Sequence, residues 1–79
     1  MKTIKVSICW SGNNYCAQTH SDELNGIIVS THKTLEGVKT EFLTALKFHI
    51  EGCIKDGDTL PDWIISEHFE LNYFLEKTI

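Results

Sequence analysis

The side chains best suited to chemistry in this sequence are its four histidines and three cysteines, which bind metal ions or act as bases and nucleophiles. In chain order they are Cys9, Cys16, His20, His32, His49, Cys53 and His68. They lack the short paired spacings of zinc motifs, and the best grouping, Cys9, Cys16 and His20, has no defined fourth ligand. We therefore predict no metal site and no cofactor.

Catalysis by a cysteine needs a histidine within hydrogen-bond reach and a third group that orients it. His49 and Cys53 are four residues apart, which places them on one face of a helix, but both belong to its apolar stripe. We interpret this pair as structural. Carboxylate pairs are also scarce, because the first three predicted strands have none and Glu36, Glu41 and Glu51 fall on the solvated side of the helix. The sequence therefore predicts that the protein is not an enzyme.

Three strands are expected in the first third of the chain. Apolar and polar residues alternate over residues 3–10, which predicts a strand covered on one face. Residues 11–14 favour a hairpin loop, and a second strand follows over residues 15–20. After a polar connection, residues 26–31 are rich in β-branched side chains and predict a third strand. Together they form an antiparallel meander.

The hairpin fixes which side chains of the first two strands meet. A loop of residues 11–14 places Trp10 opposite Tyr15 and Cys9 opposite Cys16. Two alternatives remain for the cysteines: a cross-strand disulfide in an oxidising preparation, or free thiols in the cytosol. We expect free thiols.

One long helix follows the third strand. Thr34 is its best N-cap, since the hydroxyl can accept from a free backbone amide. Gly37 is unusual in the first turns, and close approach to a neighbouring backbone would explain it. Residues 55–58 form a turn that ends the helix, and Pro61 should keep the chain from resuming helical structure at once. The stripe that should cover the sheet consists of Leu35, Val38, Phe42, Ala45, Leu46, His49 and Cys53.

A fourth strand is predicted over residues 67–74, where Phe69, Leu71 and Tyr73 alternate with polar neighbours. The order is then β-β-β-α-β. This is an α+β fold in which an antiparallel sheet carries one helix on one face. Residues 75–79 contain no terminating signal, so we expect that a further segment once followed them.

Length and composition place the chain among small intracellular proteins. Its 79 residues predict a single domain over residues 1–79 with a small core. A formal net charge of -4 and a pI of about 5.4 disfavour a phosphate backbone as the primary ligand. No apolar run approaches the roughly 20 residues of a membrane helix, no signal peptide is evident, and an odd number of cysteines does not fit a disulfide framework. We expect a cytoplasmic protein without membrane contact.

Aromatic residues in the last third of the chain leave two alternatives open. Trp63, Phe69 and Tyr73 belong to a segment too apolar for a solvated loop, which either folds back on the core or forms an exposed patch for a partner. Phe48, on the opposite helix face from Phe42, favours the patch. The small core, the open sheet edges and this apolar segment leave surface to cover, so we also expect a homo-oligomer, most simply a dimer.

Several short segments of this chain have the order and spacing of a known family. They are Met1-Lys2-Thr3-Ile4-Lys5-Val6, Asn14-Tyr15-Cys16-Ala17, Leu24-Asn25-Gly26-Ile27, Lys33-Thr34-Leu35-Glu36, Ala45-Leu46-Lys47-Phe48-His49-Ile50-Glu51-Gly52 and Asp56-Gly57-Asp58-Thr59-Leu60-Pro61. Taken together they resemble the N-terminal domain of HicB-type antitoxins. The resemblance runs over nearly the whole chain, and its specificity lies in the order and spacing of the segments.

The resemblance implies a reduced ribonuclease H-like fold without nuclease activity, and the role of an antitoxin in a bacterial type II toxin-antitoxin system. The implied partner is a HicA-type toxin, a small RNA-cleaving protein with a catalytic histidine, which the antitoxin inhibits by covering the active site. We assign this contact to Phe48, Trp63, Phe69, Glu70 and Tyr73. We expect the apolar anchors among them to contribute more than charge.

The chain departs from the family pattern in three places. Family antitoxins usually add a C-terminal helix-turn-helix or ribbon-helix-helix module, and no residues remain for one after Ile79, so DNA is a partner only if the native protein is longer. His32 stands where the family often has a glycine, and Gly37 where it often has an acidic residue. Two other interpretations stay open: a stand-alone protein-interaction module, and a double-stranded RNA-binding-like domain, which the excess of Asp and Glu disfavours.

Overall fold

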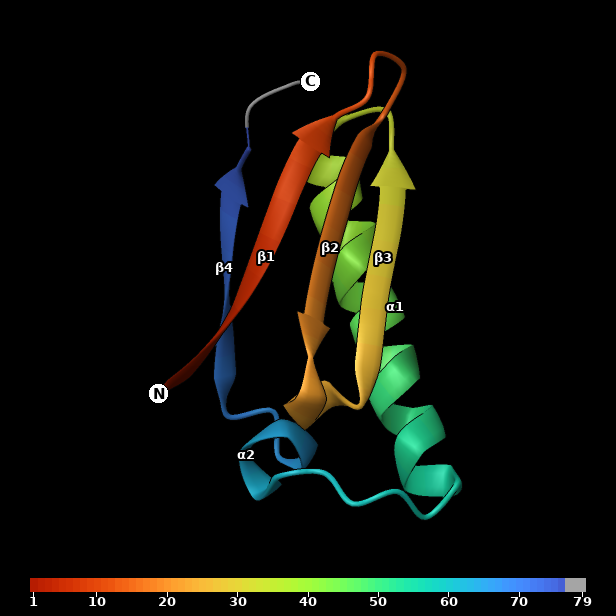
Figure 1. Cartoon of the computed structure of the whole chain (residues 1–79), viewed down its shortest axis with the longest axis vertical. Coiled ribbons are helices and arrows are strands. Elements are labelled where there is room, and N and C mark those ends of the chain that lie inside the picture. Colours follow the sequence, from red (N-terminus) through yellow and green to blue (C-terminus); the bar gives the residue numbers. More distant parts are fainter. Residues whose placement is uncertain (77–79) are drawn as a thin grey trace.

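The computed structural model describes residues 1–76, which form four strands, one long helix and two short helical segments (Figure 1). In chain order these are β1 (Lys2–Trp10), β2 (Tyr15–Ser21), the 3-10 helix η1 (Asp22–Leu24), β3 (Gly26–His32), α1 (Leu35–Lys55), α2 (Asp62–Ile65) and β4 (Phe69–Leu75). Within the described residues, no helix has both the length and the hydrophobicity needed to cross a membrane. Residues 77–79 of the tail for which we expected a continuation lie outside the described residues.

The four strands form one sheet in the order β3-β2-β1-β4, and α1 packs on one face of it (Figure 1). This α+β arrangement confirms the predicted order β-β-β-α-β with one main helix. The sheet is mixed rather than wholly antiparallel as predicted, because β4 pairs parallel to β1. The reason is the path of the chain: after α1 it passes through α2 at the end of the sheet where β1 begins, so it enters β4 in the direction of β1.

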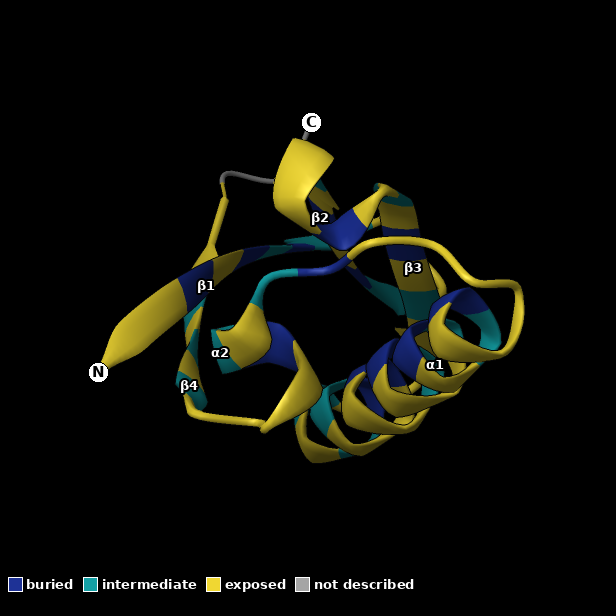
Figure 2. Ribbon diagram, turned by 90° about the horizontal axis from the view of Figure 1, so that it is seen from below, coloured by how far each residue is buried: buried dark blue, intermediate teal, exposed yellow. Residues whose placement is uncertain are grey.

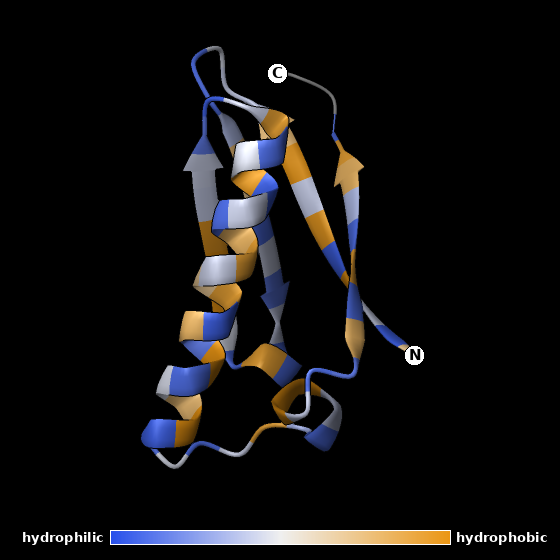
Figure 3. Cartoon of the chain, turned by 180° about the vertical axis from the view of Figure 1, so that it is seen from behind, coloured by the Kyte–Doolittle hydropathy of each residue, from blue (hydrophilic) through white to orange (hydrophobic). Residues whose placement is uncertain are grey.

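The core lies between the sheet and α1 (Figure 2). Alternate residues of the strands contribute to it because successive side chains point to opposite faces, and hydrophobic positions of β1 are visible behind α1 in Figure 3. Of the predicted helical stripe, Leu35, Ala45 and His49 are only partly buried, whereas Ile50, which the stripe omitted, is buried. The buried hydrophobic residues are Ile4, Val6, Ile8, Ala17, Leu24, Ile28, Val38, Phe42, Leu46, Ile50, Cys53, Leu60 and Ile64.

Several local predictions are confirmed. Trp10 pairs with Tyr15 and Cys9 with Cys16 across the first hairpin. The Trp10 and Tyr15 rings also stack at a tilt, with centroids 4.8 Å apart. Thr34 is the N-cap of α1, and its hydroxyl accepts the N–H of the residue three positions later at 3.0 Å. The cap satisfies one of the free amides at the helix start.

Gly37 leaves room for a side chain and not, as was predicted, for a neighbouring backbone. A Cβ at this position would collide with the imidazole ring of His32, rather than with a neighbouring backbone. Thr34 holds that ring in place, because its backbone N–H donates to His32 Nδ1 at 3.1 Å. His32 and Gly37 therefore lie against each other.

The chain resumes helical structure sooner than predicted. Pro61 is the N-cap of α2 rather than an obstacle to it, and its φ of -58° already suits entry into a helix. Glu67 then takes a left-handed φ of 59°, which ends α2 and delays the start of β4 to Phe69, two residues later than predicted. The N–H of His68 donates to the Trp63 carbonyl at 2.9 Å and closes this turn.

Candidate interaction surfaces

His49 and Cys53, the closest approach to a catalytic pair in the sequence, make a structural contact. His49 Nε2 lies 2.6 Å from the carbonyl oxygen of Leu24 and 3.6 Å from Cys53 Sγ. A carbonyl oxygen only accepts, so Nε2 carries the proton and donates it to Leu24. The same nitrogen is then unable to take a proton from the Cys53 thiol. His49 instead connects α1 to η1.

Cys9 and Cys16 face each other on the sheet surface that α1 leaves uncovered. Both are half-buried free thiols. Burial, and then the neighbouring Cys9 thiol, raise the pKa of Cys16 above its ordinary value. His20 has the same parity on β2, but within residues 1–76 no three His, Cys, Asp or Glu side chains come close enough to hold a metal ion.

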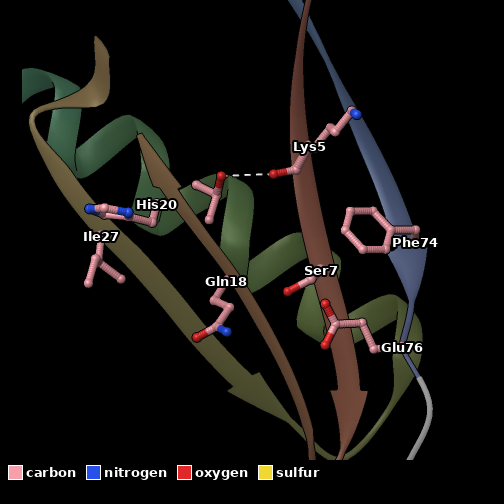
Figure 4. A pocket seen from close by; sticks show the side chains of 8 residues that line it. Lys5, Ser7, Gln18, His20, Ile27, Phe74 and Glu76 are labelled. Atoms are coloured by element: carbon pink, nitrogen blue, oxygen red, sulfur yellow. Dashed lines mark hydrogen bonds between the residues drawn. The ribbon is translucent and has the colours of Figure 1, made fainter. Parts of the chain in front are cut away.

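The uncovered face also contains an open hollow of about 460 Å³ that sequence reasoning missed (Figure 4). The register of β1 with β2 runs from Ser7 to Trp10, and beyond it the two strands diverge. The Thr19 hydroxyl bridges the gap by donating to the Lys5 carbonyl at 2.8 Å. Strand parity alone would have placed Lys5 and His20 on this face. Glu76 also lines the hollow, and among residues 1–76 it forms no ion pair with Lys5 or His20.

The β4 edge holds four of the five residues that we assigned to a partner contact, Trp63, Phe69, Glu70 and Tyr73. Trp63 and Phe69 pack edge to face, with ring centroids 6.2 Å apart, and the Lys2 ammonium lies 5.8 Å from the Trp63 ring centroid. Tyr73 meets Phe42 of the core in the same geometry at 6.4 Å. The segment therefore folds back on the core, which was the first of the two alternatives, and its rings remain only half-buried.

Tyr73 is held from two sides. Its hydroxyl donates to the Lys39 carbonyl at 3.4 Å, and the Lys39 ammonium lies 5.1 Å from the centre of its ring. Burial raises the pKa of the Tyr73 phenol above its ordinary value. Glu70, by contrast, is exposed and belongs to the opposite face of β4, because it has the other parity along the strand. The four assigned residues of this region thus share an edge but not a face.

The chain segment that forms this edge has an unbalanced charge of its own, although Lys2 and Lys39 of neighbouring elements lie over two of its rings. Over residues 62–76 the chain contains four carboxylates, Asp62, Glu67, Glu70 and Glu76, and no lysine or arginine. Only Glu67 has an ion-pair partner within residues 1–76, Lys47 at 3.8 Å, and both side chains are more than half exposed. An ion pair this exposed contributes little to stability. Sequence analysis missed this asymmetry, although a charge count along the chain contains it.

Phe48 lies apart from the other assigned residues. Its side chain is 72% exposed, and it lines an open hollow of about 260 Å³ together with Ala45, His49 and the middle of β3. Because β3 and β4 are the two opposite edges of the sheet, Phe48 cannot form one continuous surface with Trp63 and Phe69. On the uncovered side of the same edge, Ile27 and Val29 are 62% and 48% exposed. The molecule therefore has two separate candidate surfaces.

Comparison of the chain with protein-family models, with curated proteins and with solved structures finds no match. The resemblance to HicB-type antitoxins consequently rests on the segments quoted above and on their order along the fold.

Proposed function

We propose that this chain is a non-catalytic binding domain that inhibits a HicA-type, RNA-cleaving toxin by covering the toxin's active site. The proposal takes the class of partner from the family resemblance. The observation that carries it is the charge of the segment that forms the β4 edge, because residues 62–76 include four carboxylates and no lysine or arginine. Lys2, Lys39 and Lys47 of β1 and α1 lie beside this segment and offset part of its charge. We assign the toxin to this edge.

The charge of the β4 edge suits a partner that binds RNA. A protein that cleaves RNA attracts a polyanion, and it does so with lysine and arginine side chains around its active site. An inhibitor that covers this region needs the opposite charge. Glu70 and Asp62 are exposed beside the open strand. Complementary charges of this kind speed encounter and fix the orientation of the partners.

Aromatic side chains beside these carboxylates supply the apolar part of the contact. Trp63, Phe69 and Tyr73 are half-buried, so each ring is fixed on the core and still presents surface. A ring that is already fixed loses little entropy on binding. Truncating such an anchor commonly costs an interface about 2 kcal/mol or more, whereas peripheral charges cost much less. The outer side of β4 also offers main-chain groups for strand addition.

This proposal assigns no catalytic role to the chain and places it in the cytoplasm, where a toxin meets cellular RNA. Its three cysteines are free thiols, which suits a reducing compartment. Among the described residues, the arrangement nearest to a nucleophile and base is that of Cys53 and His49. Nε2 of His49, the nitrogen nearest the thiol, is already hydrogen-bonded to the Leu24 carbonyl.

The experiment starts from the neighbouring gene, which should encode a short basic protein containing a histidine. RNA cleavage by that protein is measured while the present chain is added, and we expect inhibition that is complete near equimolar amounts. Glu70→Gln should slow association at low salt and lose this effect at high salt. Glu23→Gln, an exposed carboxylate in η1, is the matched control and should leave association unchanged.

Three outcomes would contradict the proposal. Undiminished RNA cleavage in the presence of the wild-type chain would exclude the antitoxin function. Binding of double-stranded RNA by the chain alone in a filter assay at low salt would favour the nucleic-acid alternative instead. If Phe48→Ala abolishes inhibition and Glu70→Gln changes nothing at any salt concentration, the toxin-binding surface would be the β3 edge.

A further inference from the structure

The main-chain groups along β3 that face outward can be assigned from hydrogen bonds across the sheet. The Ile8 carbonyl accepts the N–H of Glu76 at 2.7 Å, so even-numbered residues of β1 direct their main-chain groups toward β4. The Lys5 carbonyl accepts from Thr19 of β2, so odd-numbered residues of β1 face β2. This alternation follows from strand geometry, since successive residues direct their N–H and C=O groups to opposite sides.

The same alternation carries across β2 to the open edge. Gln18 pairs with Ser7 and faces β1, so its neighbours Ala17 and Thr19 face β3. Their partners on β3 have even numbers, because Ala17 pairs with Ser30. The odd-numbered residues of β3 therefore direct both main-chain groups away from the sheet. They are Ile27, Val29 and Thr31.

Nothing in the composition of β3 protects this edge. Natural edge strands commonly block pairing with a lysine, a proline or a bulge, and the strand Gly26–His32 has no lysine, no proline and no acidic residue. Its outward residues are β-branched, which favours strand pairing. The opposite edge differs, because β4 carries Glu70 within the strand.

We propose that β3 pairs antiparallel with β3 of a second copy of this chain, so that two sheets join across a two-fold axis at Val29. In this register Val29 lies opposite itself, and Ile27 lies opposite Thr31 of the second copy. Each copy contributes three outward N–H groups to three outward carbonyls of the other, which makes six hydrogen bonds (three from each copy). The strand is complementary to its own reversed sequence at these positions, as a two-fold interface requires.

Charge at the two ends of β3 supports the antiparallel direction. Asp22 and Glu23 lie in η1, which Asn25 alone separates from the strand, and Lys33 comes directly after the strand. All three side chains are polar and at least partly exposed. An antiparallel copy brings Lys33 of one chain to the end of the seam where the acidic turn of the other lies. The chain's net charge of -4 opposes association at long range, and this local arrangement offsets part of it.

Phe48 is the side chain that covers the seam from the helix side. It lies on α1 beside Ile28, at the open hollow next to the β3 edge. A second strand laid along β3 would fill the space below this ring, which explains an otherwise costly exposed phenylalanine. The joined sheet has β4 at both outer ends, so the proposed toxin surface stays free and the two proposals are independent.

The first test is sedimentation velocity of the wild-type chain over micromolar to millimolar concentration. We expect a species of twice the 9.0 kDa chain mass. Val29→Lys places two like charges opposite each other at the axis and should raise the dimer dissociation constant by about tenfold or more. Asn72→Lys is the matched control, because Asn72 is also exposed and lies on the same sheet face at the other edge. It should leave the dimer dissociation constant unchanged.

Phe48→Ala should weaken the dimer, whereas Ile54→Ala should not, because Ile54 is an exposed apolar residue elsewhere on α1.

Hydrogen exchange on the wild-type chain tests the register without any substitution. The amides of Ile27, Val29 and Thr31 should become more protected as concentration rises through the dimer transition, and outward amides of β4 should not. The proposal is overturned by a monomer throughout the concentration range, by a dimer that Asn72→Lys disrupts and Val29→Lys does not, or by a dimer in which β3 protection does not change.

Discussion

The β3 edge and the β4 edge belong to the same sheet but hold their apolar side chains differently. At β4, Trp63, Phe69 and Tyr73 pack edge to face on each other or on the core, and lysine ammonium groups cover two of the rings. At β3, Phe48 and Val29 have no such cover. The hydrophobicity of a segment therefore does not distinguish a residue that completes the fold from one that is available to a partner.

The difference follows from the size of the helix relative to the sheet. A helix is about 10 Å wide, and four strands about 4.8 Å apart form a wider surface than one helix covers. Here α1 lies mainly over β3 and β2 (Figure 2). The half of the sheet formed by β1 and β4 must then be covered by other groups. Trp63, Phe69 and Tyr73 serve this purpose, together with the buried Leu60 and Ile64.

The largest effect should separate Trp63 from Phe48. Trp63→Ala removes the ring that packs on Phe69 beside the core, and we expect the free energy of unfolding to fall by about 2–3 kcal/mol. Phe48→Ala removes a 72% exposed ring, and the monomer should lose less than about 0.5 kcal/mol. Urea unfolding at low protein concentration measures both, because dimerisation then contributes nothing.

Equal losses of unfolding free energy for the two variants would mean that the two edges do not differ in the way described. A large loss for Phe48→Ala in the monomer would mean that Phe48 supports the fold. A small loss for Trp63→Ala would mean that α2 and β4 are held on the core by other contacts.

Sequence patterns were sufficient for the four strands, for α1 and for the first hairpin, but not for η1 or α2. Two-residue alternation located β1 and β4, the hairpin loop located β2, and β-branched residues located β3. The cap at Thr34 located the start of α1. These features depend on near neighbours along the chain. The parallel direction of β4 depends on where residues 56–68 carry the chain, which no local pattern specifies. The split of the candidate contact residues between two edges has the same origin, since Phe48 and Trp63 are related only through the strand order.

An intermediate effect is expected at the upper end of the β3 edge, where His32 packs on Gly37. Gly37→Ala usually stabilises a helix by up to about 1 kcal/mol, but here the methyl group meets the His32 ring. We expect a loss of about 1–2 kcal/mol in the wild-type background. In a His32→Ala background the same substitution should stabilise. A double-mutant cycle by urea unfolding measures the reversal of sign, and a stabilising Gly37→Ala in both backgrounds would show that the ring moves aside freely.

The smallest effect concerns pH and belongs to the β4 edge alone. Burial raises the pKa of Tyr73, so the folded state favours the neutral phenol. A folded-state pKa above the unfolded value contributes stability that is complete below the unfolded value, about 10 for tyrosine, and is lost as pH rises through the folded value. Tyr73→Phe should remove this part of the loss of stability at alkaline pH, together with the long hydrogen bond to Lys39.

The difference in unfolding free energy between wild type and Tyr73→Phe, measured from neutral pH upward, should therefore shift in favour of the variant above about pH 10. A difference that stays constant with pH would mean that the Tyr73 hydroxyl is as well hydrated in the folded chain as in the unfolded one, and the β4 edge would then be as open as the β3 edge.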